Sequence, residues 1–413
     1  MKKLLCTVLS TVLAISSAAA LNMSAYADSA NTQQVSYNYW YNSSTGYTDE
    51  NVHTRQMEKL DRGLIAIKTD GGVYLSWRLF DSEDNIFGSA DKNVSFNVYR
   101  DGKKISEVAT KTNYVDSTVG TNYSVAPVIN GVEGEKCDAV TVYNNSYFDI
   151  PLSKPDDETI YDPSGNELAT YSFFPADCST GDVDGDGEYE IIVKWTSSER
   201  DVGSPGDPAY SGTVHLAAYK LDGTKLWKND IELGKNVYSS AHTVQFLIYD
   251  FDGDGKSEVM CQTSLGSKDG QGKYVSNAAQ TDEEIKAITD EENSTADYRG
   301  YGRITEGKEF LTVFNGETGV AMDTINLPTT RGSENGVDYG DDFGNRSNRF
   351  VSDIAYLDGE KPYAIYLRGY YFGRNGKQRT SIAGISWDGT ALSPTYRFDT
   401  QKGQEGYYDG AYQ

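Results

Sequence analysis

The sequence is poor in basic residues and in long apolar runs, and each shortage excludes a class of protein. Its 37 lysines and arginines stand against 61 aspartates and glutamates, so the formal net charge is -24. This balance excludes a nucleic-acid partner, because phosphate binding requires a clustered basic surface. Beyond the first residues no segment is apolar enough to cross a bilayer, so we predict a chain without a membrane span.

The N-terminus has the three parts of a secretory signal. Lys2 and Lys3 provide positive charge, an apolar run over residues 4–13 follows, and Ala25-Tyr26-Ala27 has the small residues of a cleavage site. The apolar run is too short for a membrane anchor. We therefore predict a signal peptide over residues 1–27 and a secreted, extracellular protein.

Cysteine is also scarce. Of the four cysteines, Cys6 lies in the predicted signal peptide, which leaves Cys137, Cys178 and Cys261. An odd count argues against a dense disulfide framework and allows at most one pair. Three buried thiols that pack as small hydrophobic side chains are an equally good interpretation.

Composition divides the remaining chain into three parts. Residues 28–55 are polar and predict a flexible leader. Residues 56–145 contain short alternating strands separated by turns, among them the hairpin signal Arg100-Asp101-Gly102. This pattern predicts a small Ig-like β-sandwich domain. Residues 146–413 form the third part.

An internal repeat organises residues 146–413. Each of three copies has strands on both sides of a tight glycine turn, at Asp222-Gly223, Asn315-Gly316 and Asp388-Gly389. Four strands in each copy are the content of one propeller blade. The predicted fold class is therefore all-β, with a β-sandwich-like domain followed by a partial β-propeller.

The second copy carries an insertion over residues 268–305. Within it, Thr281-Asp282-Glu283-Glu284 has the form of a capping box and could open a short helix. A loop over the binding face and a solvated charged excursion are both compatible with this segment.

Two acidic loops of identical spacing are the strongest chemical signal. Each has three aspartates at alternate positions, a glycine that permits a sharp turn, and a glutamate at the ninth position, followed by a strand. Ca²⁺ takes six to eight oxygen ligands, one of them usually a backbone carbonyl, here that of the seventh residue. Without a cation so many carboxylates would repel one another. The predicted calcium ligands are Asp182, Asp184, Asp186, Glu188 and Glu190 in the first loop, and Asp250, Asp252, Asp254, Lys256 and Glu258 in the second.

The context of these loops distinguishes among the structures that use the motif. EF-hands and dockerins place such a loop before a helix, whereas both loops here precede strands. A propeller-type loop is therefore predicted, in which each ion holds a loop between neighbouring blades. A direct catalytic role of the two ions is the alternative.

Other catalytic patterns are missing. No Ser/His/Asp order, HExxH motif or glycine-rich phosphate loop is present. His215 lies between Val214 and Leu216, and we interpret it as a packing residue. His242 could be a ligand, a base or a satisfied core histidine.

The ordered motifs resemble the rhamnogalacturonan lyases of polysaccharide lyase family 11, over roughly residues 54–413. The resemblance rests on the segments 57–63, 75–78, 96–100, 181–187, 193–195, 219–224, 344–346 and 368–371. It implies a small N-terminal β-sheet domain, a calcium-rich propeller and β-elimination at galacturonate, in which a base removes the proton α to the carboxylate. The implied partner is pectic polysaccharide, rhamnogalacturonan I, and we expect a monomer.

The resemblance also assigns a substrate site, with departures. Family members carry Asn-Asp before the first acidic loop and Asp after Lys-Trp, and here these positions are Ala176-Asp177 and Thr196. Asp177 and His242 are therefore the predicted substrate-binding residues. Chains of the family continue past the position of Gln413, so we expect a fragment that lacks its last blades and its catalytic base.

Three functions are compatible with these observations. The first is a calcium-dependent rhamnogalacturonan lyase. The second is a noncatalytic or altered-specificity propeller that binds plant cell-wall glycan, which the changes at Ala176 and Thr196 favour. The third is a calcium-dependent adhesion propeller, against which the motifs outside the loops argue.

Overall fold

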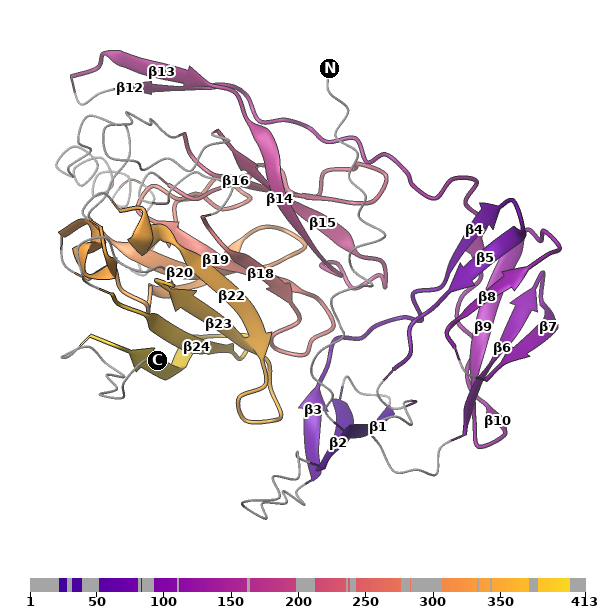
Figure 1. The fold of residues 1–413 in the computed structure, drawn as a ribbon. Helices are drawn as coiled ribbons and strands as arrows, with labels where there is room; N and C mark the ends of the chain where they lie inside the picture. Colours follow the sequence, from indigo (N-terminus) through magenta and orange to yellow (C-terminus); the bar gives the residue numbers. More distant parts are fainter. Residues whose placement is uncertain are drawn as a thin grey trace. The chain divides into compact units, whose positions relative to one another are not determined.

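The computed structural model describes most of the chain and divides it into two compact units, residues 1–150 and 151–413 (Figure 1). The described residues are 22–27, 32–38, 52–80, 93–109, 111–161, 164–197, 212–234, 243–275, 307–332, 334–341, 344–370 and 378–401, together with Glu83, Val237 and Glu283. Within them no helix is long and apolar enough to cross a membrane.

The first unit opens with a three-stranded antiparallel sheet. Its strands are β1 (Asn22–Ala27), β2 (Thr32–Asn38) and β3 (Val52–Gln56), in that order. A flexible leader was predicted over residues 28–55, so β2 and most of β3 are regular structure where none was expected. Thr, Val and Tyr in these stretches favour extended chain. The charged and apolar parts of the predicted signal peptide, residues 1–21, lie outside the described residues.

Two further sheets form a β-sandwich in the same unit. One sheet has the order β4 (Ile65–Thr69), β5 (Gly72–Ser76), β8 (Asn113–Asp116). The other has the order β10 (Val132–Glu133), β9 (Asn122–Ile129), β6 (Val94–Arg100), β7 (Lys103–Val108), and β11 (Val140–Thr141) also pairs with β9. The predicted hairpin is confirmed: Asp101 and Gly102, both with positive φ, connect β6 to β7.

Alternation along the strands places one apolar face of each sheet in a shared core. Val73, Leu75 and Trp77 face inward from the β5 side, and Phe96 and Val98 from β6. The rings of Trp77 and Phe96 meet edge to face with centroids 5.5 Å apart. The two sheets are therefore held together mainly by this buried apolar layer.

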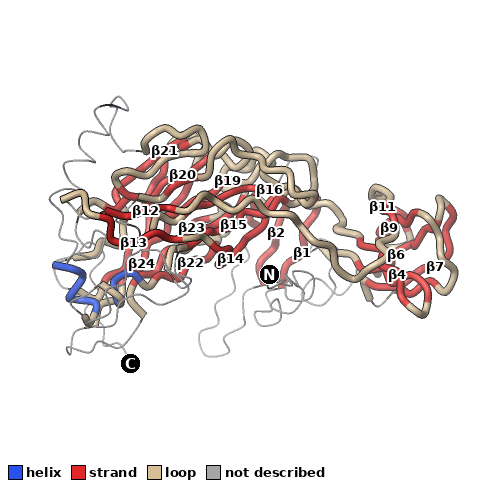
Figure 2. Tube along the Cα trace, turned by 90° about the horizontal axis from the view of Figure 1, so that it is seen from above, coloured by secondary structure: helices blue, strands red, loops and turns tan. Residues whose placement is uncertain are grey.

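The second unit contains three consecutive four-stranded antiparallel sheets after the hairpin β12 (Glu158–Tyr161) and β13 (Glu167–Tyr171). In each sheet the strands pair in chain order (Figures 1 and 2). The first sheet is β14 (Phe174–Gly181), β15 (Glu190–Thr196), β16 (His215–Tyr219), β17 (Ile231–Glu232). The second is β18 (Phe246–Tyr249), β19 (Glu258–Ser264), β20 (Glu309–Phe314), β21 (Ala321–Asn326). The third is β22 (Phe350–Ala355), β23 (Tyr363–Arg368), β24 (Ser381–Trp387), β25 (Leu392–Asp399), and the 3-10 helices η2 (Glu334–Tyr339) and η3 (Arg346–Asn348) precede it.

The three sheets pack face to face through two apolar layers. Every residue of the central strands β15 and β19 is buried. Along β19 the side chains alternate, because successive residues of a strand point to opposite faces. Val259 and Cys261 pack toward the first sheet, whereas Met260 packs toward the third.

The structure confirms the all-β class, the sandwich and the position of each repeat. The three glycine turns directly follow β16, β20 and β24, as predicted. The propeller itself stays a prediction. The predicted capping box lies outside the described residues apart from Glu283. Cys137, Cys178 and Cys261 are all free, so no pair forms among them. Only Cys261 is buried, since Cys137 is half-buried and Cys178 is exposed, so the alternative of three buried thiols holds for Cys261 alone.

Trp77 provides a test of the sandwich. We expect Trp77→Ala to lower the free energy of unfolding of this unit by about 3–5 kcal/mol, because the change leaves a cavity between the two sheets. Urea unfolding followed by tryptophan fluorescence or circular dichroism measures it. Val115→Ala is the matched control, since Val115 is 51% exposed and its truncation should have little effect. Equal losses in both variants would contradict this packing.

Candidate metal centres

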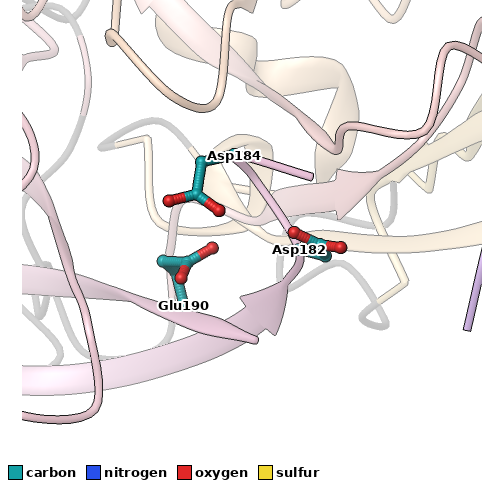
Figure 3. A group of neighbouring side chains, drawn as sticks. All are labelled: Asp182, Asp184 and Glu190. Carbon is teal, nitrogen blue, oxygen red and sulfur yellow. The ribbon is translucent and has the colours of Figure 1, made fainter. Parts of the chain in front are cut away.

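The first acidic loop connects β14 to β15 and gathers carboxylates. Ligand atoms of Asp182, Asp184 and Glu190 lie within 4.8 Å of one another. Figure 3 shows the carboxyl groups of Asp184 and Glu190 facing each other, with Asp182 beside them. Glu190 is buried, whereas Asp184 is partly open to solvent.

The backbone of this loop binds half of the carboxylate oxygens. Asp182 accepts hydrogen bonds from Gly185 N at 2.7 Å and Gly187 N at 3.0 Å. Oδ1 of Asp184 accepts from Asp186 N, and Oδ1 of Asp186 accepts from Glu188 N. Oε2 of Glu190 accepts from Val183 N at 3.0 Å. The second oxygens of Asp184, Asp186 and Glu190 are left for a cation.

The second acidic loop, between β18 and β19, repeats this network bond for bond. Asp250 accepts from Gly253 N and Gly255 N at 2.7 and 3.0 Å. The corresponding bonds of Asp252, Asp254 and Glu258 come from Asp254 N, Lys256 N and Phe251 N. Asp250, Asp252 and Asp254 offer ligand atoms within 4.8 Å of one another.

Glycine is required at two positions of each loop. Gly185 and Gly187 have φ of 79° and 92°, and Gly253 and Gly255 have 82° and 92°. Side chains with a Cβ rarely adopt such angles. The glycines therefore permit the sharp turn that points successive carboxylates to one side.

The corresponding loop of the third sheet lacks the acidic cluster. It connects β22 to β23, and its Asp358 accepts from Glu360 N, Lys361 N and the Tyr363 hydroxyl. Among the described residues only the first two sheets present a group of carboxylates of this kind. The described residues therefore support two metal centres of this kind.

Burial makes both clusters unfavourable when they are fully charged. It raises the pKa of Glu190 to about 7, and the charges of Asp184 and Asp186 add to this rise. In the second loop burial raises the pKa of Asp250 to about 6 and that of Glu258 to about 9, again with the help of neighbouring aspartates. A bound divalent cation would remove this penalty.

The residues present fit a hard divalent cation. Their donors are carboxylate and backbone oxygens, which hard cations prefer, and no thiol or imidazole joins the described clusters. The side chain of Glu188 is exposed and that of Lys256 pairs with Glu317 at 2.6 Å, so these two residues would contribute their carbonyls. The Glu258 carboxylate is held against the second loop by the hydrogen bond that it accepts from Phe251 N.

One cation at the first loop was not anticipated from the sequence. Lys220, just after β16, places Nζ 2.6 Å from Asp184 Oδ2, 2.9 Å from Asp186 Oδ2 and 3.8 Å from Glu190 Oε1. It lowers the pKa of Asp186. Pairing of Ile191 with Tyr219 sets this contact, and the sequence does not give that register.

Of the two predicted substrate residues, Asp177 lies toward the end of the first sheet away from the acidic loop, and His242 is not among the described residues. Asp177 is on β14 and 52% exposed, and its carboxylate is 3.8 Å from Lys194 Nζ. His242 lies outside the described residues, but its neighbour Thr243 gives its carbonyl to the buried Lys194. His215 stacks edge to face on Phe173, in agreement with its predicted packing role.

Lys194 also supports an unusual backbone. Its ammonium donates to the carbonyls of Thr243 and Val244 at 3.0 and 3.3 Å. Val244 has a φ of 58°, a conformation that a β-branched residue rarely adopts. Lys194 therefore links β15 to this strained connection.

A buried ionic network lies at the same end of the second and third sheets and was not predicted from the sequence. Arg368 binds Glu309 through two hydrogen bonds of 2.8 and 2.9 Å, and Arg331 binds the same carboxylate. Arg379 pairs with Asp399. These pairs join residues distant in the chain, so local spacing gave no signal for them.

The C-terminal domain of rhamnogalacturonan lyase family 11 matches residues 147–413, and the β-sheet domain of rhamnogalacturonan I lyases matches residues 55–143. The chain belongs to family 11 of the rhamnogalacturonan lyases. The family model covers all three four-stranded sheets and both acidic loops.

Two relatives of family 11 come from Bacillus subtilis. Rhamnogalacturonan endolyase YesW is 43% identical over 353 residues, which are 84% of this chain and 50% of YesW. Rhamnogalacturonan exolyase YesX is 40% identical over 360 residues, 86% of this chain and 52% of YesX. The chain thus spans about half the length of the curated relatives it matches.

Solved structures of family 11 agree with this result. The crystal structure of exotype lyase YesX has a TM-score of 0.67 and 38% identity, covering 86% of this chain and 53% of YesX. The Bacillus licheniformis rhamnogalacturonan lyase has a TM-score of 0.66 and 43% identity, covering 85% of this chain and 54% of its own.

The raised pKa values give a test of the two loops. Without metal, Glu190, Asp250 and Glu258 stay protonated in the folded chain above the pH at which they ionise when unfolded. The free energy of unfolding therefore decreases as the pH rises through the raised pKa values of these groups in the folded chain. We expect the melting temperature in EDTA to fall between about pH 5 and about pH 9, and calcium to reverse the fall, because ionised carboxylates bind it.

Differential scanning fluorimetry with and without calcium measures this dependence. Glu258→Gln is the matched variant, since it removes the group with the largest rise while it keeps the shape of the side chain. Its melting temperature in EDTA should depend less on pH. A flat or rising melting temperature of the unsubstituted chain in EDTA would contradict the carboxylate repulsion.

Proposed function

We propose that the chain acts in a secreted, calcium-dependent lyase that cleaves rhamnogalacturonan I of pectin by β-elimination at galacturonate. The observation that carries the proposal is its 43% identity with an endolyase over 84% of the chain, together with the family match to residues 147–413. Secretion is supported by the signal at residues 1–27. Membership in a lyase family argues against an adhesion propeller.

The reaction requires neutralisation of the galacturonate carboxylate. The proton α to that carboxylate is weakly acidic, and its removal spreads negative charge onto the carboxylate oxygens. The chain itself carries a net charge of -24, which repels a polyanion. Calcium bound by the two loops would reduce this charge by about four.

Calcium would also have a structural role between the sheets. The first loop contacts the second sheet, where Ser257 N donates to the Asp182 carbonyl at 2.7 Å. The turn of the second sheet is close by, and Gly316 accepts a 2.7 Å hydrogen bond from the Trp227 indole. A Cβ at Gly316 would come within 2.0 Å of the Ser257 carbonyl. An ion in the first loop would therefore stabilise a tight junction between two sheets.

The three sheets fit blades of a β-propeller. Each has four antiparallel strands in chain order, and successive sheets pack face to face. In this arrangement both acidic loops lie at one end of the sheets. Asp177, Lys194 and the Glu309–Arg368 pair lie at the opposite end. We propose that the polysaccharide binds at this second end, to a monomer.

An assay of the purified chain tests the lyase. If the catalytic base lies within this chain, the ultraviolet absorbance of the unsaturated product should rise with rhamnogalacturonan as substrate, and EDTA should abolish the rise by removing the ions that hold the sheets. Re-addition of calcium should restore it. Absence of product from a chain that is folded by circular dichroism would favour either a fragment without activity of its own or the second candidate.

The second candidate is a noncatalytic or altered-specificity glycan-binding protein. Ala176 and Thr196 stand at positions where the family resemblance implies a sugar-binding Asn and Asp. The pairing of β14 with β15 brings the two close together, since Phe174 pairs with Thr196 and a bulge follows at residues 175–177. Thr196 is completely buried. Both departures from the family pattern therefore lie at one end of the first sheet.

Restoration of both residues tests this candidate. If the changes altered specificity, Ala176→Asn with Thr196→Asp should strengthen binding to rhamnogalacturonan by about tenfold, as one recovered charged hydrogen bond would give. Isothermal titration calorimetry with rhamnogalacturonan oligosaccharide measures it. Thr180→Asn, near the other end of β14, is a control. Unchanged affinity in the double variant would remove the support for this candidate.

A further inference from the structure

The carboxylate oxygens that remain available in each acidic loop define where a cation can bind. In the first loop the backbone occupies Oδ1 of Asp184, Oδ1 of Asp186 and Oε2 of Glu190. The partner oxygens, Oδ2 of both aspartates and Oε1 of Glu190, are those most open to a metal ion, which Asp182 would also help to hold.

Lys220 contacts this same set of oxygens. Its ammonium is 2.6 Å from Asp184 Oδ2, 2.9 Å from Asp186 Oδ2 and 3.8 Å from Glu190 Oε1. An ammonium and a calcium ion cannot share these oxygens at contact distance, since both would occupy the same space and repel each other. A metal ion must therefore displace Lys220 from the first loop.

The second loop has the same backbone network without such a lysine. Phe314 occupies in the second sheet the place of Tyr219 in the first, since Val259 pairs with Phe314 as Ile191 pairs with Tyr219. Asn315 therefore stands where the first sheet has Lys220. Its amide oxygen accepts from Thr318 within its own turn. Among the described residues no ammonium or guanidinium forms an ion pair with Asp252, Asp254 or Glu258.

A second difference in charge between the two loops would, by itself, favour cation binding at the first loop. Position seven is Glu188 in the first loop and Lys256 in the second. Lys256 is paired with Glu317 at 2.6 Å on the surface, and the side chain of Glu188 is exposed. Solvent and salt screen these two charges. The direct contacts of Lys220 outweigh them.

We propose that Lys220 is a tethered cation that competes with calcium at the first loop, so that the second loop binds calcium more tightly and fills first. The inference rests on the proposed calcium binding by both loops. It makes Lys220 a residue that sets the difference in affinity between two loops of equal backbone geometry.

Calorimetry on single-loop variants tests the proposal. Calcium chloride is titrated into the EDTA-stripped full chain. Glu258→Gln weakens the second loop and isolates the first, and Glu190→Gln does the reverse. We expect the isolated first loop to bind calcium about tenfold more weakly than the isolated second loop, which corresponds to a few partly exposed ion pairs.

The decisive variant is Lys220→Asn in the Glu258→Gln chain, because it gives the first loop the residue of the second. It should tighten calcium binding by about tenfold. Lys220→Met is a second neutral variant and should give the same gain. Lys220→Arg keeps the cation and Lys228→Asn removes an equal charge from an exposed position, so both should leave the affinity unchanged.

Equal affinities of the two isolated loops, or no gain in either neutral variant, would overturn the role of Lys220 and leave calcium binding intact. An equal gain in Lys228→Asn would show a general charge effect and would also overturn it. Heat-silent titrations of the unsubstituted chain, together with an unchanged melting temperature in calcium, would refute calcium binding itself.

Discussion

Convergence of carboxylates at the junctions between sheets is the constraint on which the second unit depends. Each acidic loop turns sharply on two glycines and thereby brings four or five acids to one side of the chain. Part of their charge is satisfied by backbone N–H groups of the same loop. A cation would neutralise the remainder, and burial of Glu190 and Glu258 would strengthen its binding. The first loop also contacts the second sheet through the bond from Ser257 N to the Asp182 carbonyl, so cation binding in the loop and packing of the two sheets are coupled.

Charge is distributed unevenly along these sheets. The acids of the two loops are at the end where β14 passes to β15 and β18 passes to β19. At the opposite end, buried cations such as Lys194 and Arg368 are tied to carbonyls and to Glu309. Both cations are buried, so the acidic loops and these internally paired cations occupy opposite ends of the same sheets. The end at which we propose that the polysaccharide binds is therefore the end away from the acidic loops.

Local features of the fold followed from the sequence, and long-range pairing did not. The spacing of Asp182, Asp184 and Asp186 predicted the loop because the backbone hydrogen bonds to these carboxylates come from residues of the same loop. The glycine turns and the hairpin at Asp101 were predictable for the same reason. Lys220 reaches the first loop only through the register of β15 and β16. Arg368 and Glu309 meet across two sheets. Neither contact leaves a trace in residue spacing.

The alternation along β19 limits how this protein can vary. Val259 and Met260 are neighbours in sequence, yet they belong to two different apolar layers. Insertion or deletion of a single residue in this strand would exchange the side chains of both layers at once. Substitution is therefore the only tolerated change within such a strand. Differences in length between relatives should therefore accumulate in the connections between strands, which the layered packing leaves unconstrained.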